Sequence, residues 1–162
     1  MYSIAQINIG RTLAPLTDPL MSGFVAQLDT INALADRSPG FIWRLQTPEG
    51  DATTIRAYED DRIIVNMSVW NSLEDLANYV YASDHRQVVK QRRQWFQRFD
   101  GPFMALWWLP QGHIPAIEEG KERLEYLRAH GETAYAFSFK KPFPAPDTQS
   151  EVPTDILADC LA

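Results

Sequence analysis

Cysteine is almost absent from this chain of 162 residues. Its one cysteine, Cys160, excludes an internal disulfide and a thiolate metal cluster. The three histidines show no paired spacing typical of metal ligands, so we expect no dedicated zinc or iron site. The sequence also lacks a glycine-rich phosphate-binding loop and a Gly-x-Ser-x-Gly nucleophile elbow. These absences argue against a P-loop nucleotide-binding protein and against a serine hydrolase of the elbow type.

Positive charge is also sparse. The chain has 15 Lys and Arg against 21 Asp and Glu, a net charge of −6, and no basic stripe, so we expect no nucleic-acid partner. The longest uncharged stretch, residues 101–117, is broken by Pro102, Pro110 and Pro115 and cannot form a membrane helix. The N-terminus lacks the basic region and apolar run of a secretory signal. We therefore expect a cytoplasmic protein without a membrane partner.

Apolar residues, by contrast, are plentiful at 45% of the chain, which suits one packed domain. We place that domain at residues 1–141 and a Pro-rich, acidic tail at residues 142–162. Alternation and turn residues predict strands at 2–9, 41–47, 62–70, 103–109 and 133–139, with a short edge strand at 53–58. Apolar periodicity and capping residues predict helices at 18–36, 72–82, 83–99 and 115–129.

This order of elements predicts an α+β fold of the ferredoxin-like type, an antiparallel sheet with helices on one face. The third strand carries large apolar side chains on both faces. One face bears Ile63, Val65, Met67 and Val69, and the other bears Ile64, Asn66, Ser68 and Trp70. Because the helices can cover only one face, we expect a homodimer that packs sheet to sheet as a dimeric α/β barrel.

Two ionisable residues, His85 and Arg92, share the apolar face of the helix predicted at 83–99. A buried, unpaired charge costs several kcal/mol, so Arg92 needs an anionic or carbonyl partner. In one interpretation Arg92 bonds backbone carbonyls and His85 is a core histidine. In the other, Arg92 holds a substrate anion and His85 moves a proton or ligates a cofactor, which makes both of them candidate catalytic residues.

Polar and aromatic side chains on the strands predict a small-molecule pocket against that helix. Gln6 and Asn8 share one face of the first strand, and two adjacent tryptophans on the fourth strand must point to opposite faces. A loop histidine, His113, could enter the mouth of the pocket, although a capping role is the more common use of such a residue. The candidate substrate-binding residues are Asn8, Asn66, Trp70, Tyr81, Trp95, Trp107, Trp108 and His113.

Six groups of residues occur in one order along the chain. They are Ala5-Gln6-Ile7-Asn8, Ser38-Pro39-Gly40-Phe41-Ile42-Trp43-Arg44, Ser68-Val69-Trp70, Ser83-Asp84-His85-Arg86, Arg92-Arg93-Gln94-Trp95-Phe96, and Ala105-Leu106-Trp107-Trp108-Leu109-Pro110 with Gly112-His113. In these groups the chain from about residue 2 to residue 141 resembles the bacterial family called domain of unknown function 3291. That family is placed in the dimeric α/β-barrel superfamily with the antibiotic-biosynthesis monooxygenases.

The resemblance implies a range of functions rather than one. The superfamily includes cofactor-free oxygenases, haem-degrading oxygenases, and lyases or isomerases of polyketides. Its haem-degrading branch is similar in having an Asn at the position of Asn8, but the Trp of that branch falls at Tyr79 and its His near Val89. We expect an enzyme that acts on a hydrophobic or aromatic metabolite with a polar or anionic group and needs no cofactor. The alternative is a non-catalytic small-molecule-binding or haem-binding dimer.

Overall fold

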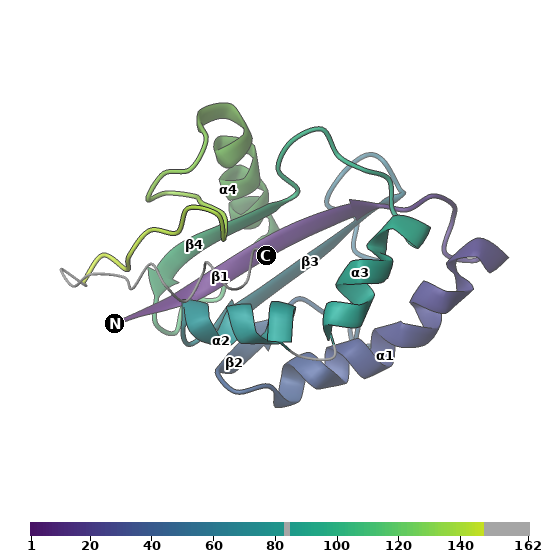
Figure 1. Cartoon of the computed structure of the whole chain (residues 1–162), viewed down its shortest axis with the longest axis horizontal. Coiled ribbons are helices and arrows are strands. Elements are labelled where there is room, and N and C mark those ends of the chain that lie inside the picture. The colour runs from purple at the N-terminus through teal and green to yellow at the C-terminus, as the bar shows by residue number, and fades with distance from the viewer. Residues whose placement is uncertain (83–84, 148–162) are drawn as a thin grey trace.

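The computed structural model describes residues 1–82 and 85–147, without the side chains of residues 85, 86 and 88. One antiparallel sheet has the strand order β2-β3-β1-β4 (Figure 1). The strands are β1 (Tyr2–Arg11), β2 (Phe41–Arg44), β3 (Ile63–Trp70) and β4 (Met104–Pro110). The helices are η1 (Pro19–Met21), α1 (Ser22–Arg37), α2 (Leu73–Ala77), η2 (Asn78–Ala82), α3 (His85–Trp95) and α4 (Ile117–His130). The fold is α+β and ferredoxin-like, as predicted.

Local signals account for where the helices begin. The Asp18 carboxylate accepts a hydrogen bond from the Leu20 amide at 2.9 Å, and Pro19 occupies the first position of η1, which leads into α1. Ser72 caps α2 by accepting from the Asp75 amide at 3.0 Å. The helix predicted at 72–82 is only partly regular, because α2 changes to the π-helical turn η2 at Asn78. None of the helices in the described chain is long and apolar enough to cross a bilayer.

Two predicted strands do not form. The segment at 53–58 is made of turns and extended chain rather than an edge strand. The segment at 133–139 meets the sheet at one point only, where Phe137 exchanges backbone hydrogen bonds of 2.8 and 2.9 Å with Leu106 on β4. Phe137 and Phe139 are buried and Tyr135 is half-buried, but the chain turns away after that bridge, with a hydrogen bond from the Lys141 amide to Ser138 O. The segment therefore packs side chains into the core without pairing along its length as a strand.

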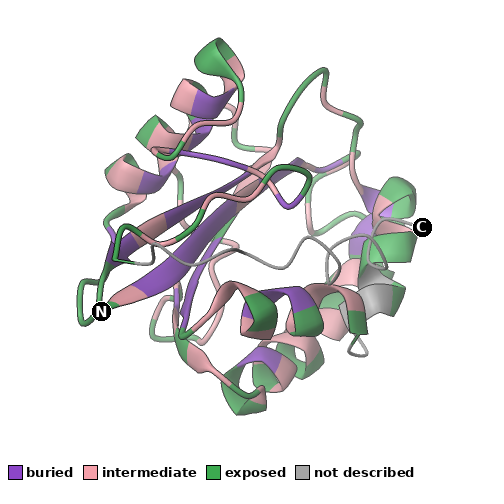
Figure 2. Ribbon diagram, turned by 60° about the vertical axis from the view of Figure 1, so that its left-hand side comes forward, coloured by how far each residue is buried: buried purple, intermediate pink, exposed green. Residues whose placement is uncertain are grey.

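The two faces of the sheet are covered by different elements of the same chain (Figure 2). Helix α4 packs on the face that bears Val65, Met67 and Val69, which are 3%, 0% and 1% exposed. Gly120 of α4 approaches this face so closely that an added Cβ would stand 2.8 Å from Met67 Sδ. This face does not need a second copy of the chain to cover it, because α4 already buries it. The reason given for a homodimer is therefore wrong. The homodimer stays a prediction without that support.

The opposite face is covered by α1, α2, η2 and α3, which we call the helix layer (Figures 1 and 2). Its apolar part lies around Ile4, Trp70 and Leu106. The segment after residue 139 joins this cluster, since Phe143 packs against it and its carbonyl accepts a hydrogen bond from Trp108 Nε1 at 2.8 Å. Residues 148–162, most of the predicted tail, lie outside the described chain.

Candidate functional site

Four polar side chains lie at the middle of the sheet, on the face toward the helix layer. They are Gln6 and Asn8 of β1 and Asn66 and Ser68 of β3, and we call them the polar sheet centre. Gln6 stands opposite Ser68 in the strand register, and Asn8 stands opposite Asn66. Alternation along each strand directs all four side chains to the same face. The β1–β3 register therefore places these four strand residues side by side.

Hydrogen bonds connect the polar sheet centre into one network. Gln6 Nε2 donates to Asn66 Oδ1 at 2.6 Å and to Ser68 Oγ at 2.9 Å. Asn8 Nδ2 donates to Gln6 Oε1 at 2.9 Å. At the buried end, Trp70 Nε1 donates to Ser68 Oγ at 2.9 Å. Because Trp70 has no exposed surface and its only donor is engaged, this predicted substrate-contact residue supports the network from within the core.

The network extends from a buried end to a solvent-exposed end. Gln6 and Ser68 are each 5% exposed, whereas Asn8 is half-buried and Asn66 is exposed. Asn66 is exposed although β3 is an internal strand, paired with β1 on one side and β2 on the other. The helix layer therefore does not seal this part of the sheet. In α1 only Ala35 is buried, and Leu28 and Ile31, which share its helical face, are half-buried.

Arg92 lies close to the polar sheet centre, at the end of β1. Its guanidinium donates to Ile9 O at 2.7 Å and lies over the rings of Phe96 and Phe103, with its Cζ 5.0 and 4.3 Å from their centroids. Burial lowers the pKa of Arg92, because desolvation disfavours its charged form. Within the described chain no carboxylate lies within ion-pair distance of it.

Gly10 of β1 allows the end of the segment that carries Arg92 to pack closely against this strand. A Cβ added to Gly10 would stand 2.6 Å from Cδ1 of Phe96, so only glycine leaves room for this ring. Gly10 and Asn8 are alternate residues on one strand face, roughly 7 Å apart along β1. Arg92 hydrogen-bonds to Ile9, the residue after Asn8, so its guanidinium lies at this end of the polar sheet centre. The sequence pattern predicted Arg92 on the apolar face of this helix, but it gave no sign of the contacts with Phe103 and Gly10.

The remaining candidates on the helix-layer side lie elsewhere. Trp95 is 6% exposed and packs against Phe24 of α1, so it joins α3 to α1. Tyr81 packs edge-to-face on Phe139, with 5.3 Å between the ring centroids. The His85 side chain lies outside the described residues, and its predicted catalytic role is an untested prediction.

Trp107 and Trp108 face opposite sides of the sheet, as the alternation predicted. Trp107 is fully buried under α4, and its indole N–H donates to Glu119 Oε1 at 3.0 Å. His113 Nε2 lies 2.8 Å from the other oxygen, Oε2, of the same carboxylate. Trp107 and His113 are thus on the far side of the sheet from Asn8, so the structure does not bring all the candidate substrate-binding residues together. Trp108 lies on the helix-layer side, but its N–H is taken by the carbonyl of Phe143.

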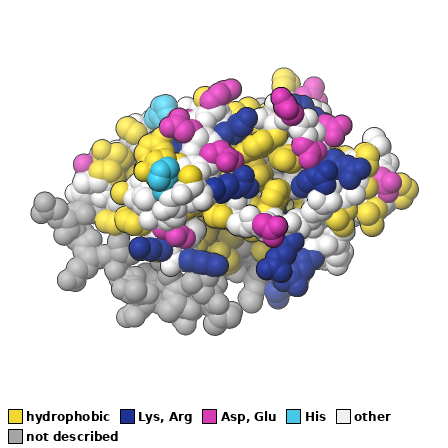
Figure 3. Space-filling view, turned by 90° about the horizontal axis from the view of Figure 1, so that it is seen from above, with side chains coloured by type: hydrophobic (Ala, Val, Ile, Leu, Met, Phe, Trp, Pro, Cys, Tyr) yellow, Lys and Arg dark blue, Asp and Glu magenta, His cyan; other side chains and the backbone are white. Residues whose placement is uncertain are grey.

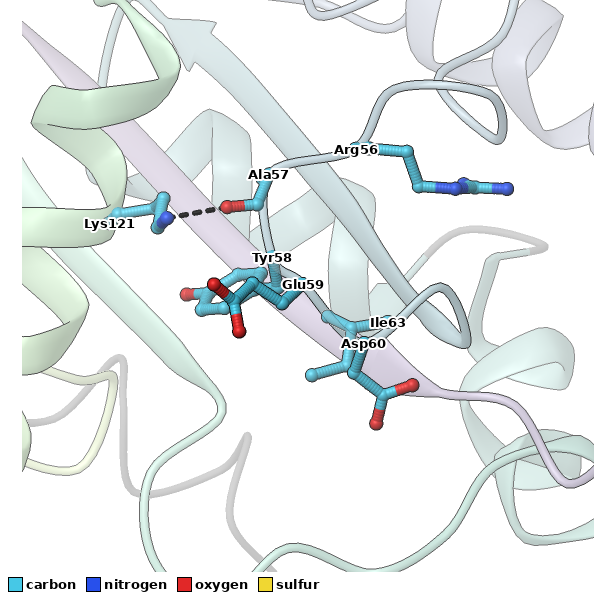
Figure 4. Close-up of a pocket in the computed structure, with 7 residues that line it drawn as sticks. All are labelled: Arg56, Ala57, Tyr58, Glu59, Asp60, Ile63 and Lys121. Carbon is cyan, nitrogen blue, oxygen red and sulfur yellow. Dashed lines mark hydrogen bonds between the residues drawn. The ribbon is translucent and has the colours of Figure 1, made fainter.

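A surface hollow of about 590 Å³ lies between the segment before β3 and α4 (Figure 4). It is lined by Arg56, Ala57, Tyr58, Glu59, Asp60, Ile63 and Lys121. The Lys121 ammonium donates to Ala57 O at 2.5 Å and lies 4.6 Å from the centre of the Tyr58 ring, so it is already engaged within the chain. Acidic and basic side chains are interspersed over the face of the molecule that Figure 3 shows. No sequence feature predicted the hollow.

A family model matches residues 3–153 of the chain, and its description is domain of unknown function (DUF3291). The chain belongs to the DUF3291 family. No curated protein and no solved structure matches it. Family membership confirms the resemblance seen in the sequence. Of the four residues of the polar sheet centre in this DUF3291 chain, Asn8 and Asn66 are the more accessible, and Arg92 bonds to the neighbouring Ile9.

The described part of this DUF3291 chain contains no group of three His, Cys, Asp or Glu residues able to hold a metal ion. The chemistry available at the polar sheet centre is that of amide donors and acceptors, one hydroxyl and one guanidinium. Such groups can orient a polar ligand and stabilise negative charge.

Proposed function

We propose that this DUF3291 protein binds a small organic molecule at the polar sheet centre, beneath the helix layer. The observation that carries the proposal is the exposure of Asn66 on an internal strand, next to a buried hydrogen-bond network. Polar side chains at the middle of a sheet are normally buried and fully paired, or replaced by apolar ones. A few convergent polar groups within an apolar and aromatic shell are typical of small-molecule sites.

Arg92 is the proposed anchor for an anionic or oxyanionic group of the ligand. A guanidinium has five N–H donors, and within the described chain Arg92 uses one hydrogen bond, to Ile9 O. The rings of Phe96 and Phe103 lie against it and partly desolvate it. A charge that is partly desolvated and has spare donors binds an anion more strongly than a fully hydrated one.

Catalysis is the extension of this proposal. A guanidinium beside an amide network would stabilise an enolate or another developing oxyanion, as an acid–base isomerase, a lyase or a cofactor-free oxygenase requires. His85 is the proposed proton-transfer group, because it begins α3 about two turns before Arg92. The non-catalytic alternative uses the same residues to hold the ligand without a reaction.

Binding of naphthoate, an aromatic carboxylate, tests the proposal in two variants of the full chain. Arg92→Met keeps an unbranched side chain between the two rings and removes the charge, so we expect naphthoate affinity to fall by about 10–100-fold. Arg93→Met changes the neighbouring exposed arginine on α3 and should bind naphthoate like the wild type. Isothermal titration calorimetry gives the three affinities.

Denaturant unfolding of Arg92→Met separates a functional role from a structural one. Only one carbonyl, Ile9 O, loses its partner, so we expect a loss of no more than about 1 kcal/mol in the free energy of unfolding. A loss of about 3 kcal/mol or more, with naphthoate affinity unchanged, would make Arg92 a structural residue and overturn the proposal.

A further inference from the structure

We infer that the polar sheet centre recognises a neutral group in which a hydrogen-bond donor stands next to an acceptor, such as a lactam or a carboxamide. The inference rests on the proposed function and deepens it by naming the ligand's chemistry at this end of the site. It concerns Asn8 and Asn66, whereas the anion proposed above contacts Arg92.

The buried members of the network have little capacity left for a ligand. Gln6 uses both N–H groups of its amide, one toward Asn66 Oδ1 and one toward Ser68 Oγ, and its oxygen accepts from Asn8. Ser68 Oγ accepts from both Gln6 and Trp70. With 5% exposure each, Gln6 and Ser68 hold the neighbouring amides in place instead of contacting a ligand themselves.

The two accessible residues, Asn66 and Asn8, have unused hydrogen-bonding groups of opposite type. Asn66 uses only its Oδ1, which accepts from Gln6, so its Nδ2 has no partner in the described chain. Asn8 uses only its Nδ2, so its Oδ1 has none. Because the two residues are direct cross-strand partners, their side chains stand about 5 Å apart. The result is one donor beside one acceptor on an open part of the sheet.

This donor–acceptor pair does not depend on which way the amides are turned. If the three amides rotate together by half a turn, Ser68 donates to the oxygen of Gln6, and Gln6 donates to Asn8. Asn66 then offers an acceptor and Asn8 a donor. In both arrangements the site presents one of each, and a ligand with only acceptors leaves one of the two groups unpaired.

The matched probes for this inference are carbostyril and coumarin. Carbostyril is an aromatic lactam whose ring N–H stands beside its carbonyl, and coumarin has the same shape with a ring oxygen in place of the N–H. We expect carbostyril to bind wild type at least about tenfold more tightly than coumarin, because coumarin cannot pair with the acceptor. Titration followed by the side-chain amide signals of Asn8 and Asn66 in nitrogen-15 NMR spectra gives both affinities and locates the contact.

Two variants complete the experiment. Asn66→Leu should remove the preference for carbostyril, and Asn71→Leu, at an exposed asparagine just beyond β3, should keep it. Equal affinity of wild type for the two probes, or a preference that survives in Asn66→Leu, would overturn this inference while naphthoate binding at Arg92 stands. If carbostyril, coumarin and naphthoate all fail to bind at millimolar concentration, the proposed function falls as well.

Discussion

The two faces of β1 differ in polarity and in exposure, although their residues alternate along one strand. Ala5, Ile7 and Ile9 point toward α4 and are at most 1% exposed. Gln6 and Asn8 point toward the helix layer and carry a hydrogen-bond network that ends at an exposed asparagine. The α4 face of β1 is thus apolar along its length, whereas the helix-layer face combines an apolar cluster around Ile4 with polar groups. The helix-layer face can keep polar groups accessible at Asn66 because apolar packing on both sides of the sheet lies elsewhere along the strands.

The largest expected effect comes from truncating a methionine on the α4 face. Met67 has no exposed surface and touches Gly120 of α4, whereas Met104, on β4, is half-buried on the helix-layer face. We expect Met67→Ala to cost about 2–5 kcal/mol of unfolding free energy, because the tightly packed face cannot collapse into the cavity. Met104→Ala is the matched control and should cost clearly less. Equal losses in urea unfolding would contradict the difference between the faces.

An intermediate effect is expected at the buried end of the network. Ser68→Ala leaves Trp70 Nε1 without an acceptor in the core, which should cost about 1–3 kcal/mol. Ser3→Ala is its control, because Ser3 is also buried in the sheet, 1% exposed, and its hydroxyl has no partner within the described chain. Thermal unfolding should show a lower midpoint for Ser68→Ala and an unchanged or higher one for Ser3→Ala. A Ser3 variant that loses as much as the Ser68 variant would argue against the network as a source of stability.

The smallest expected effect comes from the exposed end. Asn66→Leu removes the acceptor of one Gln6 N–H group at the exposed end of the network, where water can take its place, and it adds apolar surface next to the helix layer. We expect the unfolding free energy to stay within about 0.5 kcal/mol of wild type, as for an ordinary surface substitution. Chemical denaturation measures the change. A loss above about 2 kcal/mol would show that the polar sheet centre is needed for folding, and that its exposure is not evidence of a ligand.

Much of the fold could be predicted because the signals are local. Asp18-Pro19 and Ser72 mark helix starts through their own capping bonds, and the central strands follow from alternation within a few residues. The α+β class then follows from the order of these elements. The segment at 133–139 was harder, because alternation shows burial and does not say whether a neighbouring strand pairs along the whole length.

The candidate site could be predicted only in part. Asn8, Asn66 and Arg92 could be assigned to inward faces from periodicity alone, since side-chain direction repeats every two residues in a strand and every 3.6 in a helix. The position of Trp107 and His113 on the other side of the sheet could not be predicted, because the sequence does not say which strand face packs against which helix. The stacking of Arg92 on Phe103 joins two segments that are distant in the chain.

By itself the sequence determined the type and order of the central elements, the caps of the first helices, and the two-sided apolar character of β3. These depend on interactions within a few residues, which the chain's order already contains. Only the tertiary structure decided that α4 buries the Met67 face and that the helix layer leaves Asn66 open. Both outcomes depend on how closely distant segments approach, as where Gly120 meets Met67 and Gly10 meets Phe96. How closely such segments approach depends on the packing of side chains that are distant in the sequence, and a local sequence pattern does not predict that packing.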